Sequence, residues 1–438
     1  RQYVLFDALQ DKQSCLFLLD AICHRRRFRG GAGEILGVPT RSFRKIRGES
    51  KEAPSPVPGK AEQSNSSVIF GDKMILKIFR RVHPGINPDL EIGTYLTEVA
   101  AFPHVPPIAG SFQYVRAHEE PTTLAILMGF VPNQGDAWKY TLDSLGQFFE
   151  RVLTQSADIA ELPCTGPRAV RAGEESVPPK VSELIGSYLL SARQLGERTA
   201  EFHLVMASNV GNPSFAPEPF TPFYQRSLYQ SMRNLTARTF SLLRKRVRTL
   251  PEALREHGRE VLDMEARILK RFQGILDRKI TAMRIRIHGD YHLGQVLHAG
   301  KEFVLIDFEG EPARSLADRR IKRSPVRDVA GMLRSFHYAS YAPLIGDGGG
   351  GVRSGDIKSL EPWADFWNRW VSSAFLQGYL AVAREGAFLP RTEEDLSFLI
   401  DTFLLEKAIY ELGYELNNRP DWIKLPLLGI LSQFEAPE

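Results

Sequence analysis

The sequence predicts an α+β protein with two lobes, a small strand-rich part up to about residue 130 and a larger helical part after it. Three observations support this class. Residues 68–79, VIFGDKMILKIF, place two apolar runs on either side of a Gly-Asp turn, as in a β-hairpin. From about residue 138, apolar residues recur at helical spacing. A second pair of strand-like runs, within residues 284–308, interrupts the helical part.

Length and composition exclude several classes of protein. The 438 residues are 43% hydrophobic and 25% charged, which is normal for a globular chain long enough for two lobes. The apolar runs are well short of the roughly 20 residues that span a bilayer, so we expect no membrane association. A net charge of +4 is small for this length and does not indicate nucleic-acid binding. Three cysteines, an odd number, suggest no disulfide framework, and we expect a cytoplasmic protein.

The remaining elements follow from local signals along the chain. Residues 50–64 are rich in Pro, Ser and charge, as expected of an exposed loop. After the hairpin, Asn87 is a candidate helix N-cap, and Pro88 stands at the first helical position. Residues 122–132 have the composition of a buried strand closed by a proline. The other expected elements are helices, the last over about 393–417.

One stretch, residues 284–312, holds most of the chemistry: RIRIHGDYHLGQVLHAGKEFVLIDFEGEP. Residues 284–287 alternate as a strand and 304–306 form a second apolar strand, so each strand delivers polar groups at its end. A zinc site on His288 and His292 is one interpretation. These histidines lie four residues apart, but at a strand end with an intervening glycine and no cysteine nearby. The zinc interpretation is therefore disfavoured, and we expect His288 to brace the loop.

The alternative interpretation is phosphoryl transfer. A carboxylate at the tip of a strand can deprotonate an acceptor hydroxyl, and two oxygen ligands can hold Mg²⁺ against the phosphates of ATP. Asp290 is followed five residues later by Gln295 and seventeen residues later by Asp307. This is the spacing of the catalytic loop and the metal-binding aspartate of kinases. Lys77 lies within an expected strand, where kinases carry their phosphate-binding lysine.

Several motifs together resemble those of maltokinases, in particular the maltokinase part of bacterial trehalose synthase–maltokinase fusions. The motifs are NPDLEIGTYL, GFVPNQGDAWKYTLD, HGDYHLGQ, LIDFEGEP, SPVRDVAGMLRSF and EKAIYELGYELNNRPDW, and the resemblance covers roughly residues 60–438. That family is similar to aminoglycoside phosphotransferases and, more distantly, to protein kinases. The resemblance implies a two-lobed, protein-kinase-like fold and ATP- and Mg²⁺-dependent phosphorylation of the anomeric hydroxyl of maltose. The product, maltose 1-phosphate, feeds α-glucan (glycogen) synthesis from trehalose, so the expected partner is a trehalose synthase domain or subunit, fused or bound.

The resemblance also assigns the catalytic roles. Asp290 becomes the catalytic base, Gln295 and Asp307 become Mg²⁺ ligands, and Glu309 becomes a third ligand or supports the other two. Lys77 is expected to contact the ATP phosphates and to pair with an acidic residue of the following helix. The preferred partner is Glu91, and Glu98 is the alternative. Gln295 stands where protein kinases have asparagine; its amide oxygen can still ligate a metal, one methylene further out.

The nucleotide contacts are expected from two places in the first lobe. No Gly-x-Gly-x-x-Gly loop is present, and SNSSVIFG takes its place. The expected nucleotide contacts beside Lys77 and Glu91 are Ser66, Ser67, Met128, Phe130 and Val131. The implied domains are a cap or linker region of which part could be missing (1–64), a nucleotide-binding lobe (65–131), and a helical lobe (132–438) with the catalytic β-insert (284–308).

The sugar site is expected mainly on the helical lobe. Tyr410 and Tyr414 lie four residues apart, so both rings can stack beside a sugar, although such a pair also suits core packing. Two alternatives stay open: a kinase of another small hydroxylated substrate, such as an aminoglycoside, and a non-catalytic scaffold for an attached trehalose synthase. Mixed Arg, Tyr and Glu on the acceptor side favour a neutral sugar over a cationic one. The full set of expected substrate residues is His292, Arg314, Glu406, Lys407, Tyr410 and Tyr414.

Overall fold

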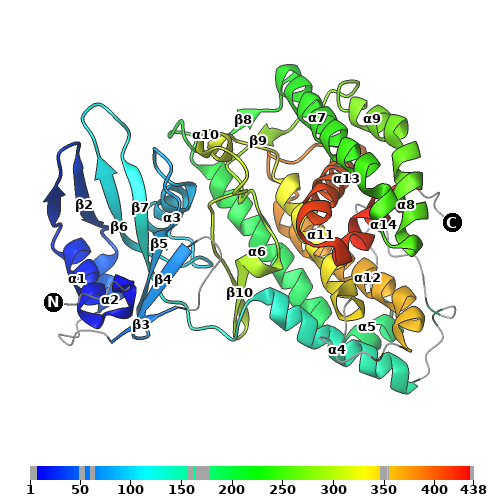
Figure 1. Cartoon of the computed structure of the whole chain (residues 1–438), viewed down its shortest axis with the longest axis horizontal. Helices are drawn as coiled ribbons and strands as arrows, with labels where there is room; N and C mark the ends of the chain where they lie inside the picture. Colours follow the sequence, from blue (N-terminus) through cyan, green and yellow to red (C-terminus); the bar gives the residue numbers. More distant parts are fainter. Residues whose placement is uncertain are drawn as a thin grey trace. The chain divides into compact units, whose positions relative to one another are not determined.

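The computed structural model describes residues 7–48, 55–59, 65–155, 159, 162, 177–345, 353 and 355–434. The chain forms two compact units (Figure 1). The first contains the residues up to Asp136 together with His288–Asp290 and Gln295–Ile321, and the second contains the others. An antiparallel sheet dominates the first unit and helices dominate the second, which confirms the predicted α+β class.

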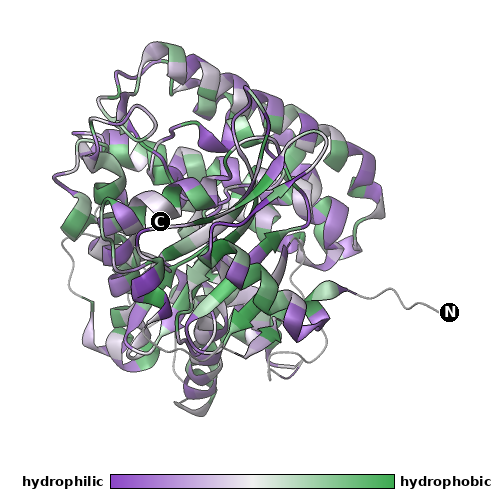
Figure 2. Ribbon diagram, turned by 90° about the vertical axis from the view of Figure 1, so that its left-hand side faces the viewer, coloured by the Kyte–Doolittle hydropathy of each residue, from purple (hydrophilic) through white to green (hydrophobic). Residues whose placement is uncertain are grey.

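The first unit is built on a seven-stranded sheet in the order β1-β2-β6-β7-β5-β4-β3, in which every neighbouring pair is antiparallel. Several of its strands are hydrophobic in Figure 2, in line with the burial of one face against helix α1 (Lys12–Cys23). The strands are β1 (Arg27–Arg29), β2 (Glu34–Pro39), β3 (Pro56–Pro58), β4 (Asn65–Phe70), β5 (Met74–Phe79), β6 (Ile108–Val115) and β7 (Thr122–Gly129).

The predicted hairpin is confirmed and lies between β7 and the edge strand β3. Strands β4 and β5 pair from Phe70 with Met74 at the turn to Asn65 with Phe79 at the open end. Apolar residues of both strands are fully buried against α1. Gly37 on β2 permits this packing, because a Cβ there would lie 2.2 Å from the carbonyl oxygen of Ala21 on α1. The hairpin is therefore held on one side by a helix and on both edges by further strands.

Two predicted elements need correction, one in each unit. The loop expected over 50–64 lies largely outside the described residues, but its described part contains strand β3, which pairs with β4. The strand expected over 284–287 is reduced to β9 (Met283–Arg284), which pairs with β8 (Glu218–Pro219), and a single bridge at Ile285. The alternation there was misleading because Arg286 is itself buried and stacks over Phe215.

Two further predicted elements of the first unit are confirmed. Helix α3 (Pro88–Glu98) begins as expected, since the Asn87 side chain accepts the N–H of Asp89 and Pro88 occupies the first turn. The apolar strand expected at 304–306 is β11 (Glu302–Leu305). It pairs with β10 (Val296–Ala299), a strand that the sequence did not predict, through a turn at Gly300, whose φ is +73°. This pair carries the chain from Gln295 to Asp307.

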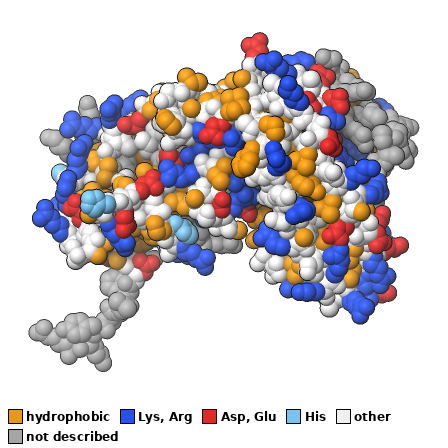
Figure 3. Space-filling model, turned by 90° about the horizontal axis from the view of Figure 1, so that it is seen from above, with side chains coloured by type: hydrophobic (Ala, Val, Ile, Leu, Met, Phe, Trp, Pro, Cys, Tyr) orange, Lys and Arg blue, Asp and Glu red, His pale blue; other side chains and the backbone are white. Residues whose placement is uncertain are grey.

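The second unit is a set of packed helices. The longest are α12 (Ile357–Ala383), which buries three tryptophans, and α13 (Glu393–Asn418), the expected last long helix. Lys and Arg side chains alternate with Asp and Glu on the face drawn in Figure 3. No helix within the described residues is apolar enough over a sufficient length to cross a membrane. The other helices of eight residues or more are α4 (Ala137–Gln155), α6 (Tyr188–Ser208), α7 (Pro222–Arg246), α8 (Glu252–Asp263), α9 (Glu265–Gln273), α11 (Val326–Tyr341) and α14 (Lys424–Leu431).

Helices α6 and α12 approach each other closely through a pair of glycines. A Cβ at Gly196 would lie 2.0 Å from the carbonyl oxygen of Phe375, and one at Gly378 would lie 2.0 Å from that of Arg193. Backbone atoms cannot move aside without separating the helices, so each position accepts only hydrogen.

We predict that Gly378→Ala lowers the free energy of unfolding by roughly 1–3 kcal/mol, the usual cost of overpacking. The matched control is Gly146→Ala on α4, where a Cβ meets nothing within 4 Å. There alanine should raise stability by up to about 1 kcal/mol, because it is the better helix former. Urea unfolding followed by circular dichroism measures both. Equal effects of the two substitutions would contradict the close contact.

Candidate active site

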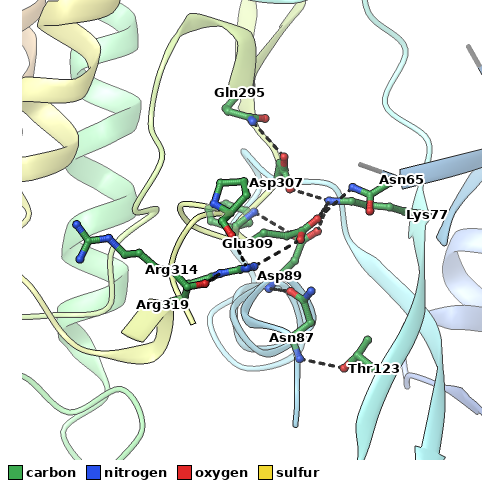
Figure 4. Close-up of polar contacts among 12 residues, drawn as sticks. Asn65, Lys77, Asn87, Asp89, Thr123, Gln295, Asp307, Glu309, Arg314 and Arg319 are labelled. Atoms are coloured by element: carbon green, nitrogen blue, oxygen red, sulfur yellow. Dashed lines mark hydrogen bonds and ion pairs between the residues drawn. The ribbon is translucent and has the colours of Figure 1, made fainter. Parts of the chain in front are cut away.

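The side chain of Lys77 lies among three carboxylates in the first unit. Its ammonium donates to Asp307 Oδ1 at 2.6 Å and to Asp89 Oδ2 at 3.0 Å, and lies 2.7 Å from Glu309 Oε1. Figure 4 shows the lysine reaching from its strand toward these groups. Lys77 is only 6% exposed, so its charge is balanced by these carboxylates rather than by water. We call these four side chains the lysine cage.

Separate elements supply the four groups. Lys77 is near the middle of β5, opposite Ser67 on β4. Asp89 lies in the first turn of α3, and its second oxygen accepts the backbone N–H of Phe308 at 2.9 Å. This bond ties the start of α3 to the segment that carries Asp307 and Glu309, and so brings all three carboxylates to one place.

The backbone around Asp307 has an uncommon conformation. Asp307 has a φ of +65°, which is rare for a residue with a side chain, and Gly310 follows at +71°. The Asp307 carboxylate accepts from Gln295 Nε2 at 3.0 Å, and Glu309 accepts from Asn65 Nδ2 at 3.2 Å. Strained positions of this kind concentrate at functional sites.

The charges of the cage shift the pKa of its members. Burial opposes the charge of Lys77, but the negative charges of Asp89, Asp307 and Glu309 outweigh it and raise the lysine pKa well above its usual value. Burial likewise opposes the charge of Asp307, but Lys77 lowers that pKa overall. The pKa of Glu309 is raised, first by burial and then by the neighbouring carboxylates. Negative charge is therefore crowded at this site, and a cation stabilises it.

The partner of Lys77 differs from the one that we expected. Glu91 lies 3.1 Å from Arg320, which also binds Glu120 at 2.9 Å, and Glu98 accepts the backbone N–H of Ser42 at 3.0 Å. Asp89 makes the ion pair with Lys77, because the first turn of α3 faces the cage. An aspartate at that position is common at helix starts, so the sequence offered no signal that set it apart.

Asp290 and His288 lie on the segment that precedes Gln295. His288 donates from Nε2 to the backbone carbonyl of Ile306 at 2.9 Å, which ties the segment of Asp290 to that of Asp307, as a brace would. Gly289 takes a φ of +85°, and Asp290 is half-buried. A half-buried carboxylate can accept a proton from a hydroxyl.

The expected nucleotide contacts lie on two strands of the same sheet or directly after one of them. The hydroxyl of Ser66 accepts from Arg80 at 3.0 Å, and Ser67 stands opposite Lys77. Met128 ends strand β7 together with Gly129. The N–H of Phe130 donates to Lys73 at 2.7 Å and the carbonyl of Val131 accepts from Asn133, so these two backbone groups are already engaged.

The expected substrate residues fall in both units. Arg314, in the first unit, binds Glu311 at 2.6 Å and points away from the cage in Figure 4. In the second unit, His292 accepts the N–H of Gly294, and Glu406 is held by Arg327 through both oxygens at 2.6 Å. The other three share α13 with Glu406: Lys407 lies over the ring of Tyr410, and Tyr414, 45% exposed, lies under Arg419.

Helix α11 of the second unit supports the segment between Asp290 and Gln295, which the sequence did not indicate. The N–H of Leu293 donates to Ser335 Oγ at 3.0 Å. One turn earlier, Gly331 leaves room for the carbonyl of Tyr291, which a Cβ would approach to 2.6 Å. A serine and a glycine four residues apart inside a helix carry no specific pattern, so only the fold reveals this support.

Comparisons with known proteins agree with a sugar-kinase relationship. No protein-family model matches the chain. A glucosamine kinase of Streptacidiphilus jiangxiensis is 22% identical over 379 residues, which make up 84% of this chain and 71% of that protein. A glucosamine kinase of Mycolicibacterium smegmatis is 46% identical over 54 residues, 12% of this chain and 13% of that protein. These relatives agree with the expected kinase superfamily and do not single out the maltokinases.

Solved structures of glucosamine kinases have a fold similar to that of this chain. A glucosamine kinase in complex with glucosamine, ADP and inorganic phosphate matches 96% of this chain and 83% of its own, with a TM-score of 0.65 and 19% identity. A second crystal form of a glucosamine kinase matches with a TM-score of 0.63. At such identities the likeness shows the fold alone, and it confirms the expected fold class.

We predict that Ser335→Ala exposes the backbone amide of Leu293 to exchange. Loss of one buried hydrogen bond worth about 1 kcal/mol should speed its hydrogen–deuterium exchange roughly fivefold. Ser340→Ala is the matched control, because that buried hydroxyl of the same helix donates to the His337 carbonyl within α11. Mass spectrometry of the peptide spanning 289–296 measures both. Unchanged exchange in Ser335→Ala would contradict the supporting role of α11.

Proposed function

We propose that this chain is an ATP-dependent kinase that transfers a phosphoryl group to a hydroxyl of a small sugar. The observation that carries the proposal is the lysine cage, in which a strand lysine meets two carboxylates of the segment DFE. A kinase needs a cation that binds phosphate beside oxygen ligands that bind a metal, and the cage holds both kinds of group. The glucosamine kinase relatives support the same reaction class.

The donor set fits Mg²⁺. The side chains that would hold the ion are Asp307 and Gln295, with Glu309 as a third ligand or behind them, and all offer hard oxygen atoms. Oxygens of Asp89, Asp307 and Glu309 lie within 4.8 Å of one another. When bound, Mg²⁺ supplies charge neutralisation at the β- and γ-phosphates. The residues of the chain do the rest: Lys77 binds a phosphate oxygen, and Asp290 orients the acceptor hydroxyl and takes its proton.

The acceptor is the finer part of the proposal. Glucosamine is the first candidate, because both relatives and the solved structure are named for it. Maltose is the second, because the motifs HGDYHLGQ and LIDFEGEP resemble those of maltokinases. Formation of maltose 1-phosphate, a link to glycogen synthesis and a trehalose synthase partner follow only if maltose is the acceptor.

A substrate panel tests the proposal. The purified chain, ATP and Mg²⁺ are mixed with glucosamine, maltose, glucose, N-acetylglucosamine or kanamycin, and ADP release and phosphorylated product are measured. ADP release with glucosamine supports the first candidate, and release with maltose the second. Release with kanamycin alone would support an aminoglycoside kinase. No release with any acceptor, in a folded sample that binds nucleotide, would overturn the proposal and favour a non-catalytic scaffold.

We predict that Asp290→Asn lowers kcat for the active sugar by a factor of about 10²–10⁴, the usual contribution of a general base. The dissociation constant for ATP should change less than about threefold, because asparagine keeps the size of the side chain and the phosphate contacts lie elsewhere. Asp72→Asn in the exposed hairpin turn is the control and should leave kcat unchanged. Undiminished turnover in Asp290→Asn would contradict the assigned base.

A further inference from the structure

In the lysine cage, the Lys77 ammonium contacts carboxylate oxygens that a bound Mg²⁺ would also use. Lys77 Nζ lies 2.6 Å from Asp307 Oδ1 and 2.7 Å from Glu309 Oε1, and both oxygens belong to residues that we assign to Mg²⁺. We propose that the Lys77 ammonium competes with the divalent cation for Asp307 and Glu309, so that metal binds tightly only when nucleotide phosphates engage the lysine. This inference rests on the proposed function, because it takes these carboxylates as metal ligands.

Distance and charge are the reasons for the proposed competition at these oxygens. Mg²⁺ binds carboxylate oxygens at about 2.1 Å. An ion at that distance from the two oxygens would share them with an ammonium less than 3 Å from each, and like charges so close in a buried site repel strongly. The phosphates of a nucleotide resolve this conflict, since they offer the ammonium new acceptors and give the metal further oxygens.

Every member of the cage keeps a partner if the Lys77 ammonium leaves Asp307 and Glu309 to bind the nucleotide phosphates. Lys77 keeps Asp89, which is 3% exposed and fixed by the N–H of Phe308. Asp307 keeps the amide of Gln295. Glu309 keeps the amide of Asn65, and Arg319 lies 3.9 Å away. No buried charge is therefore left alone during the exchange, and Asp89 gains a specific role as the anchor of the displaced lysine.

Mn²⁺ binding without nucleotide tests the proposal directly. The concentration of free Mn²⁺ is read from its electron paramagnetic resonance signal during titration of the full chain. Lys77→Met should bind one Mn²⁺ at least tenfold more tightly than the wild type. Adding Asp307→Asn to Lys77→Met should abolish the gain. Lys73→Met removes the same charge from the same hairpin, where the Lys73 ammonium donates to the Arg47 carbonyl, and should bind Mn²⁺ as the wild type does.

The outcomes separate clearly. Equal Mn²⁺ affinity in wild type and Lys77→Met, both folded by circular dichroism, would overturn the competition. If Lys77→Met unfolds without metal, Lys77→Gln serves as the second variant, because its amide still donates to the carboxylates. Recovery of the fold on adding Mn²⁺ supports the proposal, since the metal then replaces the ammonium, and unfolding of both variants regardless of Mn²⁺ overturns it. If Lys77→Met binds Mn²⁺ more tightly but the wild type phosphorylates no acceptor, the proposed function is refuted and the competition stands.

Discussion

The contact between one buried ammonium and three carboxylates joins the elements that form the candidate site of the first unit. A buried lysine without counter-charges would lose its proton, and crowded carboxylates without a cation would repel one another. Strand β5, the first turn of α3 and the segment after β11 each supply part of the cage, and the bond from Phe308 to Asp89 joins the last two. The register of the hairpin matters for the same reason, because a shift by one residue would turn Lys77 toward the apolar core.

The sequence predicts the parts of this site that local patterns determine. The hairpin, the Asn87 cap and the spacing from Asp290 to Asp307 all follow from short-range rules, and the structure has the first two as expected. The partner of Lys77 could not be predicted in this way. It depends on how α3 approaches the sheet. Asp89 and Glu91 are both acidic residues in the first turn of that helix, so no local rule distinguishes them. The strand expected at residues 284–287 was wrong because Arg286 is buried on an aromatic ring, which alternation cannot reveal.

Helices α11 and α13 show why an acidic residue is weak evidence for a sugar contact. Arg327 binds Glu406, Arg334 binds Glu411 and Tyr338 binds Glu415, so three acidic side chains of α13 meet partners on one neighbouring helix. Glu406 was expected to bind substrate, yet both of its oxygens already accept from Arg327. A sugar hydroxyl would have to share those oxygens or displace the arginine, and the role of Glu406 in substrate binding stays a prediction.

Stability alone gives a poor account of the lysine cage. Replacing buried ion pairs by apolar side chains of similar size is often neutral or stabilising, so folding does not require charges at this position. The cage also holds more carboxylates than one lysine can balance, and Arg319 approaches only Glu309. Excess negative charge around a lysine is costly for a scaffold but useful where a metal and a phosphate bind together, since the metal takes the carboxylates and the phosphate takes the lysine. This imbalance is the physical reason to prefer an enzyme over a non-catalytic scaffold.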